Sequence, residues 1–441
     1  MKRVYPYALQ HATGDNPRQI FLRRISPMKI LLVNDYATPT GGAEIAILML
    51  REGLRSRGHD ARLLSTSAEA DGAYNLADYN CFGTISSFRT LLQSANPWAF
   101  WQLRRTLAEF QPDVVHVQIF LTQLSPLILP LLRRVPSLYH VVWYRPICPL
   151  GTKMFPDGSL CQMPAGQVCY SKGCLPLHDW LPLMMQMKFW RQQLHVFDLI
   201  VANSEAVKCR LVAEGIEPET VVGVGVPIRP PRPPLSSAPM VAFAGRLVRE
   251  KGADLLLRAF ARIAAQFPQA RLLLVGDGPE REHLKNLIVE LGLSCSVAMP
   301  GQLPRPELER LFQVAWVQVV PSRWEEPYGL VAAEAMMRGT AVVASNSGGL
   351  AEVVQDGKTG ILVPPNDLDS LADALLRLLC DRGLAEQMGA AGREIALARF
   401  SEAAFVDRFI ELYQLLLQNS MNIGNNGERN GRNNSASEPG R

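Results

Sequence analysis

The sequence predicts two α/β domains, each built on a mostly parallel sheet covered by helices. Three observations predict this class. Short runs rich in Val, Ile and Leu alternate with helical segments through both halves of the chain, as repeated strand–helix–strand units require. Glycines stand where several of these runs pass from strand to helix. The proline-rich segment 227–239 interrupts the pattern, which restarts after it, as expected of a stiff linker.

Length and composition set the broad class of protein. The 441 residues are enough for two domains with substantial cores. A net charge of +4, spread along the chain, permits contact with an anionic membrane surface but does not indicate a nucleic-acid partner. No apolar run is long enough to span a bilayer, and there is no signal-peptide core. We therefore expect a cytoplasmic protein that can also contact the inner face of the membrane.

Breaks in the strand–helix pattern give the domain boundaries. Residues 1–27 show no regular spacing of apolar residues, and we expect them to be a disordered extension, unless Met28 is the natural start. The Asn- and Gly-rich end should be disordered as well. The predicted segments are an extension 1–27, an N-terminal domain 28–226, a linker 227–239, a C-terminal domain 240–400, a helix 401–418 that crosses back onto the first domain, and a tail 419–441.

The first strand–helix turn contains two adjacent glycines. An apolar strand over 30–33 is followed by Gly41-Gly42 and a helical segment over 43–58. Glycines let a backbone approach a ligand closely, and the N–H groups at a helix start can hold a phosphate. A flexible turn without a ligand explains the pair equally well.

A histidine ends the second strong strand, 113–117. Strand ends face the ligand crevice in open α/β sheets, so His116 can serve the acceptor side of a site. A hydrogen-bonded core histidine is the equal alternative.

The later helix over 180–197 has a similar ambiguity: its apolar residues follow helical spacing, which favours a core stripe. An interfacial patch for a membrane or a lipid-linked acceptor is the alternative.

Four of the eight cysteines are clustered within residues 148–174 of the first domain. Their spacings are wider than the tight pairs of most zinc folds, although four thiolates can form a tetrahedral zinc site. A structural zinc ion, an iron–sulfur cluster and ordinary free thiols are the open alternatives. The residues are Cys148, Cys161, Cys169 and Cys174.

The stretch from Val319 to Gly349 carries the most chemical information. It is typical of a strand, a short loop and a helix that ends at Gly339. Two carboxylates, Glu326 and Glu334, bracket the start of that helix, whose free N–H groups can bind a phosphate. A ligand with a phosphate between hydroxyl groups, such as a nucleotide-sugar, would meet both glutamates. Two solvated acids in a surface turn are the alternative.

Two cations follow the first strand of the second domain. Arg246 and Lys251 lie in the loop after that strand, on the ligand side of the predicted sheet. Arginine can offer two donors to phosphate oxygens, and lysine a point charge. Such cations stabilise a diphosphate as it departs, an effect worth about 3 kcal/mol in comparable sites. No convincing Asp-x-Asp metal motif lies beside them, so we expect chemistry without a metal ion.

These motifs together resemble a known family. The Glu326-x7-Glu334 pair preceded by Pro-Ser, the Gly-Gly-x-x-Glu run ending at Glu352 and the Gly-Arg-x5-Gly frame at 245–252 resemble the retaining glycosyltransferases of the GT4 family. The resemblance implies the GT-B fold, in which two Rossmann-like domains face each other across a cleft. It also implies a base site near 300–303 and donor-side roles for Gly41, Gly42, Tyr328, Gly329, Leu330, Val331 and Glu334.

The expected activity follows from that resemblance. It implies transfer of a sugar, with retention, from a UDP- or GDP-sugar to a saccharide, lipid-linked or small-molecule acceptor. Glu326, Arg246 and Lys251 would be the catalytic residues, and no cofactor would be needed. The sequence departs from the family at the usual His-Asp pair, which falls on Val142 and Trp143. An epimerase of the same fold and a non-catalytic nucleotide-sugar-binding protein therefore remain as alternatives.

Overall fold

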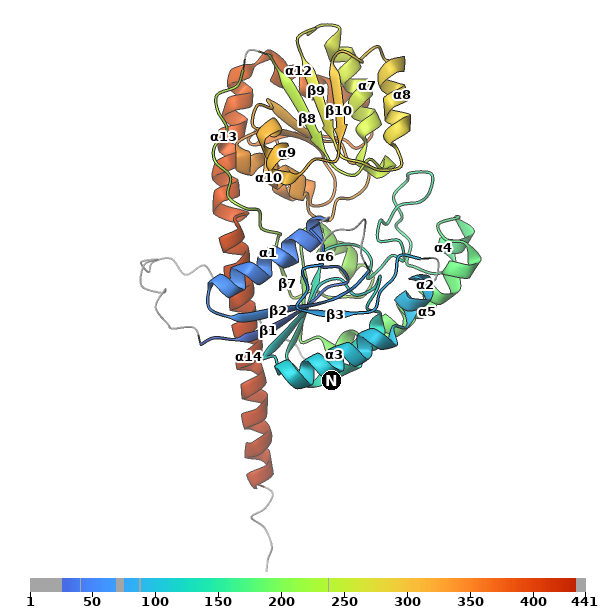
Figure 1. Ribbon diagram of the computed structural model, residues 1–441, viewed down its shortest axis with the longest axis vertical. Coiled ribbons are helices and arrows are strands. Elements are labelled where there is room, and N and C mark those ends of the chain that lie inside the picture. Colours follow the sequence, from blue (N-terminus) through green and yellow to red (C-terminus); the bar gives the residue numbers. More distant parts are fainter. Residues whose placement is uncertain (1–25, 40, 69–74, 87–88, 237, 434–441) are drawn as a thin grey trace, which may run out of the picture.

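The chain forms two α/β domains joined by a linker and a long final helix (Figure 1). The computed structural model describes residues 26–39, 41–68, 75–86, 89–236 and 238–433. Most of the predicted extension 1–27 and the last residues of the predicted tail lie outside these ranges. Both domains contain one parallel sheet, as the sequence predicts.

The N-terminal domain contains a seven-stranded sheet in the order β3-β2-β1-β4-β5-β6-β7. All of its pairings are parallel, and β1 lies between β2 and β4. The chain order reverses between β1 and β4, and ligands bind at such switch points in open sheets. The strands are β1 Lys29–Val33, β2 Asp60–Thr66, β3 Tyr79–Cys81, β4 Val114–Val117, β5 Ser137–Val141, β6 Leu199–Ala202 and β7 Thr220–Val221.

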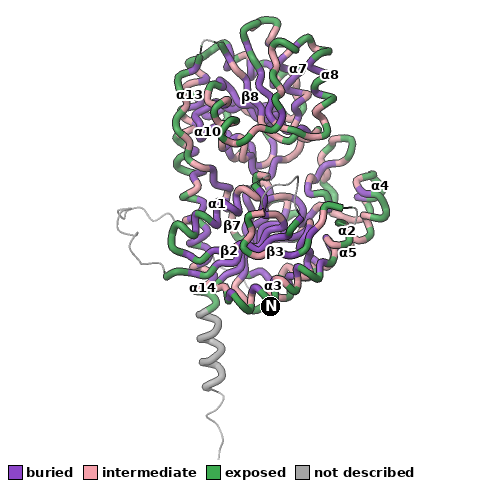
Figure 2. Tube along the Cα trace, in the orientation of Figure 1, coloured by how far each residue is buried: buried purple, intermediate pink, exposed green. Residues whose placement is uncertain are grey.

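Helices cover both faces of this sheet, whose central strands are almost wholly buried (Figure 2). On one face, Phe120 and Trp190 pack among the apolar residues of the sheet. On the other, α1 and the final helix share a core with β1 and β4. The helical segments are α1 Gly42–Ser56, α2 Arg89–Ser94, α3 Pro97–Phe110, η1 Pro126–Arg134, α4 Val168–Ser171, α5 Leu177–Gln192, η2 Leu194–Val196 and α6 Glu205–Val212.

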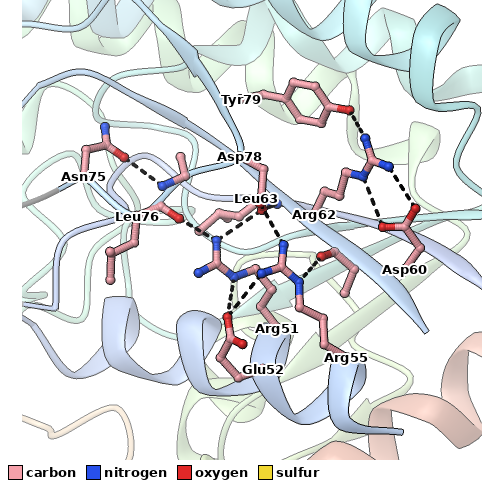
Figure 3. Close-up of polar contacts among 12 residues, drawn as sticks. Arg51, Glu52, Arg55, Asp60, Arg62, Leu63, Asn75, Leu76, Asp78 and Tyr79 are labelled. Atoms are coloured by element: carbon pink, nitrogen blue, oxygen red, sulfur yellow. Dashed lines mark hydrogen bonds and ion pairs between the residues drawn. The ribbon is translucent and has the colours of Figure 1, made fainter. Parts of the chain in front are cut away.

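A polar network holds α1 against the sheet edge (Figure 3). The carboxylate of Asp78 accepts hydrogen bonds from Arg51 at 3.1 Å and from Arg55 at 2.8 Å, both on α1. It also accepts the backbone N–H of Leu63 on β2 at 2.8 Å. One carboxylate, just before β3, therefore joins the second half of α1 to β2.

The C-terminal domain contains a six-stranded parallel sheet in the order β10-β9-β8-β11-β12-β13. Its strands are β8 Met240–Ala244, β9 Arg271–Val275, β10 Val297–Gly301, β11 Val317–Val320, β12 Ala341–Ser345 and β13 Gly360–Val363. Its helical segments are η3 Arg249–Lys251, α7 Ala253–Ala264, α8 Arg281–Glu290, α9 Arg305–Phe312, α10 Leu330–Arg338, α11 Leu350–Val353, α12 Leu368–Cys380 and α13 Arg382–Arg399. Residues 227–239 connect the domains without helix or strand in their described part.

The final helix, α14 Glu402–Asn433, belongs spatially to the N-terminal domain (Figure 1). Phe409 and Tyr413 lie in the same core as β1 and β4, and Asp407 pairs with Arg57, the residue after α1, at 2.7 Å. The helix extends past the predicted boundary at 418 into the segment predicted to be disordered. Extending an existing helix costs far less than nucleating one, so poor helix formers can continue it. Among the described residues, no helix has the length and apolar character needed to cross a membrane.

Candidate active site

The loop between β11 and α10 is shaped by glycines. Gly329 precedes α10 with φ 105°, and Gly339 ends the helix with φ 84°. A Cβ added at Gly329 would lie 2.7 Å from the Leu350 side chain, so only glycine fits there without strain. No side chain caps the start of α10. Its first N–H groups are therefore left for solvent or a ligand.

Glu326 lies buried in this loop and is paired with Lys251. Its Oε1 lies 2.5 Å from Lys251 Nζ and accepts a hydrogen bond from Ser322 Oγ at 2.6 Å. Burial acts to raise the pKa of Glu326, but Lys251 and Ser322 outweigh it and hold the pKa below its ordinary value. Glu326 is therefore an anion in the folded protein, with its charge matched by a lysine from the loop after β8.

Lys251 also contacts an aromatic ring that the sequence interpretation did not single out. Its Nζ lies 5.2 Å from the ring centroid of Trp324, within the range of a cation–π interaction. The lysine is thus held from two sides, by a carboxylate and by an indole. The only sign of this contact in the sequence is the tryptophan within the Arg-Trp-Glu-Glu stretch.

Arg246 is exposed and faces the other domain. Its side chain forms no hydrogen bond or ion pair with the residues that the structure describes. Its charge acts on Glu44, in the first turn of α1, across the domain interface. Burial, and to a lesser extent Asp35, raises the pKa of Glu44, while Arg246 opposes the rise. Glu44 was missed because its role depends on a contact between domains.

The glycine pair lies where the two helix starts approach each other. Gly41 is the residue before α1, and no side chain caps that helix either. A Cβ added at Gly42 would lie 2.9 Å from Leu330 Cδ2 at the start of α10. The two domains therefore bring two helix N-termini together, with Lys251, Glu326 and Arg246 on the C-terminal side. The start of α1 already has the carboxylate of Glu44, which accepts a backbone N–H in its first turn, whereas the uncapped start of α10 is suited to an anion.

The remaining donor-side predictions fall on the same helix and its loop. Glu334, on α10, is mostly buried and pairs with Arg305 at the start of α9. Tyr328 is buried, and a Cβ added at Gly223 of the N-terminal domain would lie 2.7 Å from its ring. Its side chain therefore packs between the domains, while Leu330 and Val331 are half-buried at the helix start.

His116 lies in the core and not at the domain interface. It is fully buried, and its Nδ1 lies 2.6 Å from the hydroxyl of Tyr413 on α14. Phe409 packs on the same ring at 4.7 Å. Burial, and secondarily His140, lowers the pKa of His116 well below its ordinary value. This is the core alternative of the sequence interpretation, and the burial leaves no access for an acceptor.

The cysteine cluster shows no metal-binding arrangement. Among the residues described, no group of three or more potential ligands is placed to hold a metal ion. All four cysteines are free thiols in the structure. Burial raises the pKa of both Cys169 and Cys174, and the nearby thiols add to the rise.

Carboxylates of the C-terminal domain also bridge to the N-terminal domain. Glu352 accepts hydrogen bonds from the backbone N–H groups of Glu205 and Ala206, at 2.9 and 2.7 Å, at the start of α6. Glu325 pairs with Arg210 of the same helix at 2.7 Å. The glutamate that ends the Gly-Gly-x-x-Glu run therefore caps a helix of the opposite domain. Its interdomain role could not be seen in the sequence.

Two family models match consecutive parts of the chain. The model described as glycosyl transferases group 1 matches residues 228–395, and the model described as Glycosyltransferase Family 4 matches residues 40–227. The boundary between the two matches falls at the start of the linker.

Curated relatives match a limited part of the chain. The D-inositol 3-phosphate glycosyltransferase of Corynebacterium jeikeium is 39% identical over 197 residues, which are 43% of this chain and 46% of that protein. The GDP-mannose-dependent alpha-(1-6)-phosphatidylinositol monomannoside mannosyltransferase of Mycobacterium tuberculosis is 38% identical over 172 residues, covering 38% of this chain and 45% of that protein. The chain thus spans less than half the length of these relatives.

The fold has a similar solved structure across most of the chain. Sucrose-phosphate synthase from Thermosynechococcus elongatus superposes with a TM-score of 0.70 at 25% sequence identity. The superposition covers 88% of this chain and 99% of that one. The similarity in fold therefore includes both domains, and GT-B is the fold of the chain.

Proposed function

Because the chain belongs to the group 1, or GT4, family of glycosyltransferases, we propose that it is a retaining enzyme that transfers a sugar from a nucleoside diphosphate sugar without a metal ion. The acceptor would be a saccharide, a lipid-linked molecule or a small molecule. The observation that carries the proposal is the buried Lys251–Glu326 pair beside the uncapped start of α10. It combines a fixed cation and a fixed anion at a helix end suited to a phosphate.

Each residue of the site has a part in the proposed reaction. Arg246, Lys251 and the start of α10 would hold the diphosphate and stabilise the negative charge that develops on it. Glu334 would accept the ribose hydroxyls, with Arg305 holding its carboxylate in place. Gly41 and Gly42 would form the opposite wall, where the absence of a side chain allows close approach.

The proposed step balances without an added acid or base. The bond between the sugar's anomeric carbon and the phosphate oxygen breaks, and a bond to the acceptor oxygen forms on the same face. The acceptor proton passes to the departing phosphate oxygen. Glu326, ionised through its contact with Lys251, is suited to orienting the sugar and stabilising its cationic transition state. As an anion it cannot supply a proton, so a role as general acid is not part of the proposal.

The donor would carry UDP or GDP. A GDP-mannose-dependent enzyme is among the relatives, and the proposed base site near 300–303 spans the end of β10 and the two residues after it. The test is incubation with UDP-, GDP- and ADP-sugars, with and without saccharide and lipid-linked acceptors, while free nucleotide and the transferred sugar are measured. Chelator is added in parallel to examine metal independence.

The matched variants are Glu326→Gln and Glu307→Gln, the second on the exposed face of α9. We expect acceptor-dependent release of nucleotide that Glu326→Gln abolishes and Glu307→Gln leaves unchanged. An isomerised donor with no release would replace the proposal with an epimerase. Binding of the donor with no turnover for any acceptor would leave a binding protein.

We also propose contact with the inner face of a membrane through α5. Leu177, Leu181 and Met185 are exposed and spaced by four residues, so they share one side of the helix. Lys188 and Arg191 line an adjacent groove of ≈ 600 Å³. An apolar stripe beside basic residues is suited to an anionic bilayer.

Vesicle sedimentation tests this surface. We expect binding to phosphatidylcholine vesicles that contain phosphatidylglycerol, reduced binding without it, and loss of binding in Leu181→Ser/Met185→Ser. The control is Val289→Ser, an equally exposed apolar residue on α8 of the other domain. Equal binding by all variants, or none by the unaltered protein, would refute membrane contact through α5.

A further inference from the structure

A charged cavity is present whose lining includes neither Lys251 nor Glu326. It has a volume of ≈ 450 Å³ and is formed by the linker, α9 and the end of α10. Three arginines line it, Arg229, Arg305 and Arg338, together with one acid, Glu309. The lining is therefore positively charged, and its volume is within the range of cavities that bind small molecules.

Glu309 is shared between two of the arginines. Its Oε2 accepts a hydrogen bond from Arg338 Nη1 at 3.0 Å, and its Oε1 lies 3.2 Å from Arg229 Nη2. The second contact has ion-pair distance but lacks hydrogen-bond geometry, so both atoms are buried without a hydrogen-bond partner. One carboxylate thus faces two guanidinium groups and forms a hydrogen bond with only one of them.

Arg338 is the least solvated of these cations. It is 2% exposed, and its Nε has no hydrogen-bond partner among the described residues. Its other contacts are Gln318 Oε1 at 2.5 Å and the face of Phe312 at 5.4 Å, both neutral groups. A buried cation is costly unless charge and hydrogen bonds compensate for it. The cavity therefore has donors and positive charge beyond what its own acid provides.

The third arginine connects the cavity to the donor side. Arg305 lines the cavity and pairs with Glu334. Glu334 and Arg338 are separated by one helical turn on α10, so they face α9 from the same side. Arg305 therefore stands between the two sites, and no residue of the Arg246–Lys251 loop lines the cavity.

We propose that this cavity binds a small phosphate-bearing molecule at a site separate from the donor diphosphate. Guanidinium groups are suited to phosphate because their paired N–H groups match two of its oxygens. A phosphate in the cavity supplies an acceptor for Arg229, further acceptors for Arg305 beside its pairing with Glu334, and a counter-charge for Arg338. The site lies outside the family's donor and acceptor roles described above.

Calorimetric titration with inorganic phosphate at constant ionic strength tests the proposal. Because Arg246 and Lys251 can also bind phosphate, the titration is repeated in Arg246→Gln/Lys251→Gln. We expect phosphate binding to persist in that variant and to weaken at least about 10-fold in Arg229→Gln/Arg305→Gln, since two charged contacts are removed. Arg310→Gln, an exposed arginine on the same helix, is the control and should bind as the unaltered protein does.

A second variant protects the test from a folding defect. Gln313→Glu adds an acid to the cavity lining without removing an arginine, and it should also weaken phosphate binding about 10-fold by repulsion and by competing for the arginines. Thermal unfolding verifies that each variant is folded. Phosphate binding that disappears in Arg246→Gln/Lys251→Gln and survives in both cavity variants overturns the proposal, as does an absence of binding to the unaltered protein. Loss of sugar transfer has no bearing on this outcome, so the two proposals can fail independently.

Discussion

Two buried carboxylates, one in each domain, are held in opposite ways. Asp35 follows β1 and accepts four hydrogen bonds from Thr122, Gln123 and Leu124, three of them from backbone N–H groups. Glu326 follows β11 and pairs with Lys251. Burial raises the pKa of Asp35 despite its hydrogen bonds, whereas Lys251 keeps that of Glu326 low.

The difference between Asp35 and Glu326 is between a buried charge that holds a loop in place and one that, in the proposed reaction, acts on a ligand. Asp35 fixes a loop after β4 and has no ion-pair partner among the residues that the structure describes. Glu326 and Lys251 join two loops of one domain at a helix start, where a ligand can interact with both charges. Asp35 holds the fold of the N-terminal domain, whereas Glu326, in the proposed reaction, presents charge to a ligand. Four variants can contradict or refine this contrast.

The largest effect should come from Lys251→Met. Loss of the cation removes stabilisation of the departing diphosphate and leaves Glu326 buried without its partner, so we expect the rate of sugar transfer to fall about 10²- to 10³-fold. Steady-state kinetics with the best donor measure it. Lys285→Met, whose lysine pairs with Glu282 on the exposed face of α8, should retain full activity. Full activity in Lys251→Met would remove the chemical role from this pair.

Asp35→Ala should affect stability more than donor binding. It leaves several buried N–H groups without acceptors, which costs about 3 kcal/mol of unfolding free energy in total. Denaturant unfolding measures the loss, and nucleotide titration should show unchanged donor affinity. Asp35→Asn keeps one side-chain oxygen that can accept some of these hydrogen bonds, so it should lose less unfolding free energy. A folded Asp35→Ala protein with weakened donor binding would place Asp35 in the site.

Acid should destabilise the N-terminal domain through its buried histidines. Burial lowers the pKa of His140 to about 3, so the folded state resists a proton that the unfolded chain binds near pH 6.5. His140 therefore contributes unfolding free energy that is fully present above that pH and falls by about 1.4 kcal/mol per pH unit below it, and His116, whose pKa is also lowered, adds to the slope. His140→Phe should flatten this slope when unfolding is measured between pH 7 and pH 5. An unchanged slope would mean that other groups cause the acid sensitivity.

The smallest effect should come from Glu352→Gln. The side chain keeps an oxygen for the N–H groups of α6 but loses its charge at the helix start, which is worth about 0.5–1 kcal/mol. We expect a slightly lower unfolding midpoint and unchanged activity with saturating donor. Glu290→Gln, on the exposed surface of α8, is the control. An equal shift in both variants would show that capping across the interface adds nothing.

The C-terminal half could be predicted well because its signals are contiguous. Glu326 and Glu334 are separated by seven residues, and a single strand–loop–helix unit fixes both. Arg246 and Lys251 share one loop after one strand. Their pairings were not predictable: the Lys251–Glu326 contact joins residues 75 positions apart, and Arg305 reaches Glu334 over 29 positions. Periodicity indicates which elements form, but not which loops meet.

The N-terminal half was less predictable because distant segments complete it. His116 stands at a strand end, as a site residue would, yet Tyr413, 297 positions later, makes it a core residue. The contact of Gly42 with Leu330 and the effect of Arg246 on Glu44 likewise cross between domains. The helix α14 was expected at 401–418, but nothing in the Asn- and Gly-rich residues after it indicated that the helix continues.

The position of α14 has a consequence for synthesis of the protein. The N-terminal domain leaves the ribosome before the C-terminal domain, but Phe409 and Tyr413, which cover His116 and the β1–β4 face, follow both. Domains generally fold as they emerge. Here the first domain must wait, with one face of its sheet open, until the C-terminal domain and the first turns of α14 have been translated. Its nascent form is therefore the stage at which chaperones would be most needed, and a ribosome stalled within the C-terminal domain would release a first domain that lacks part of its own core.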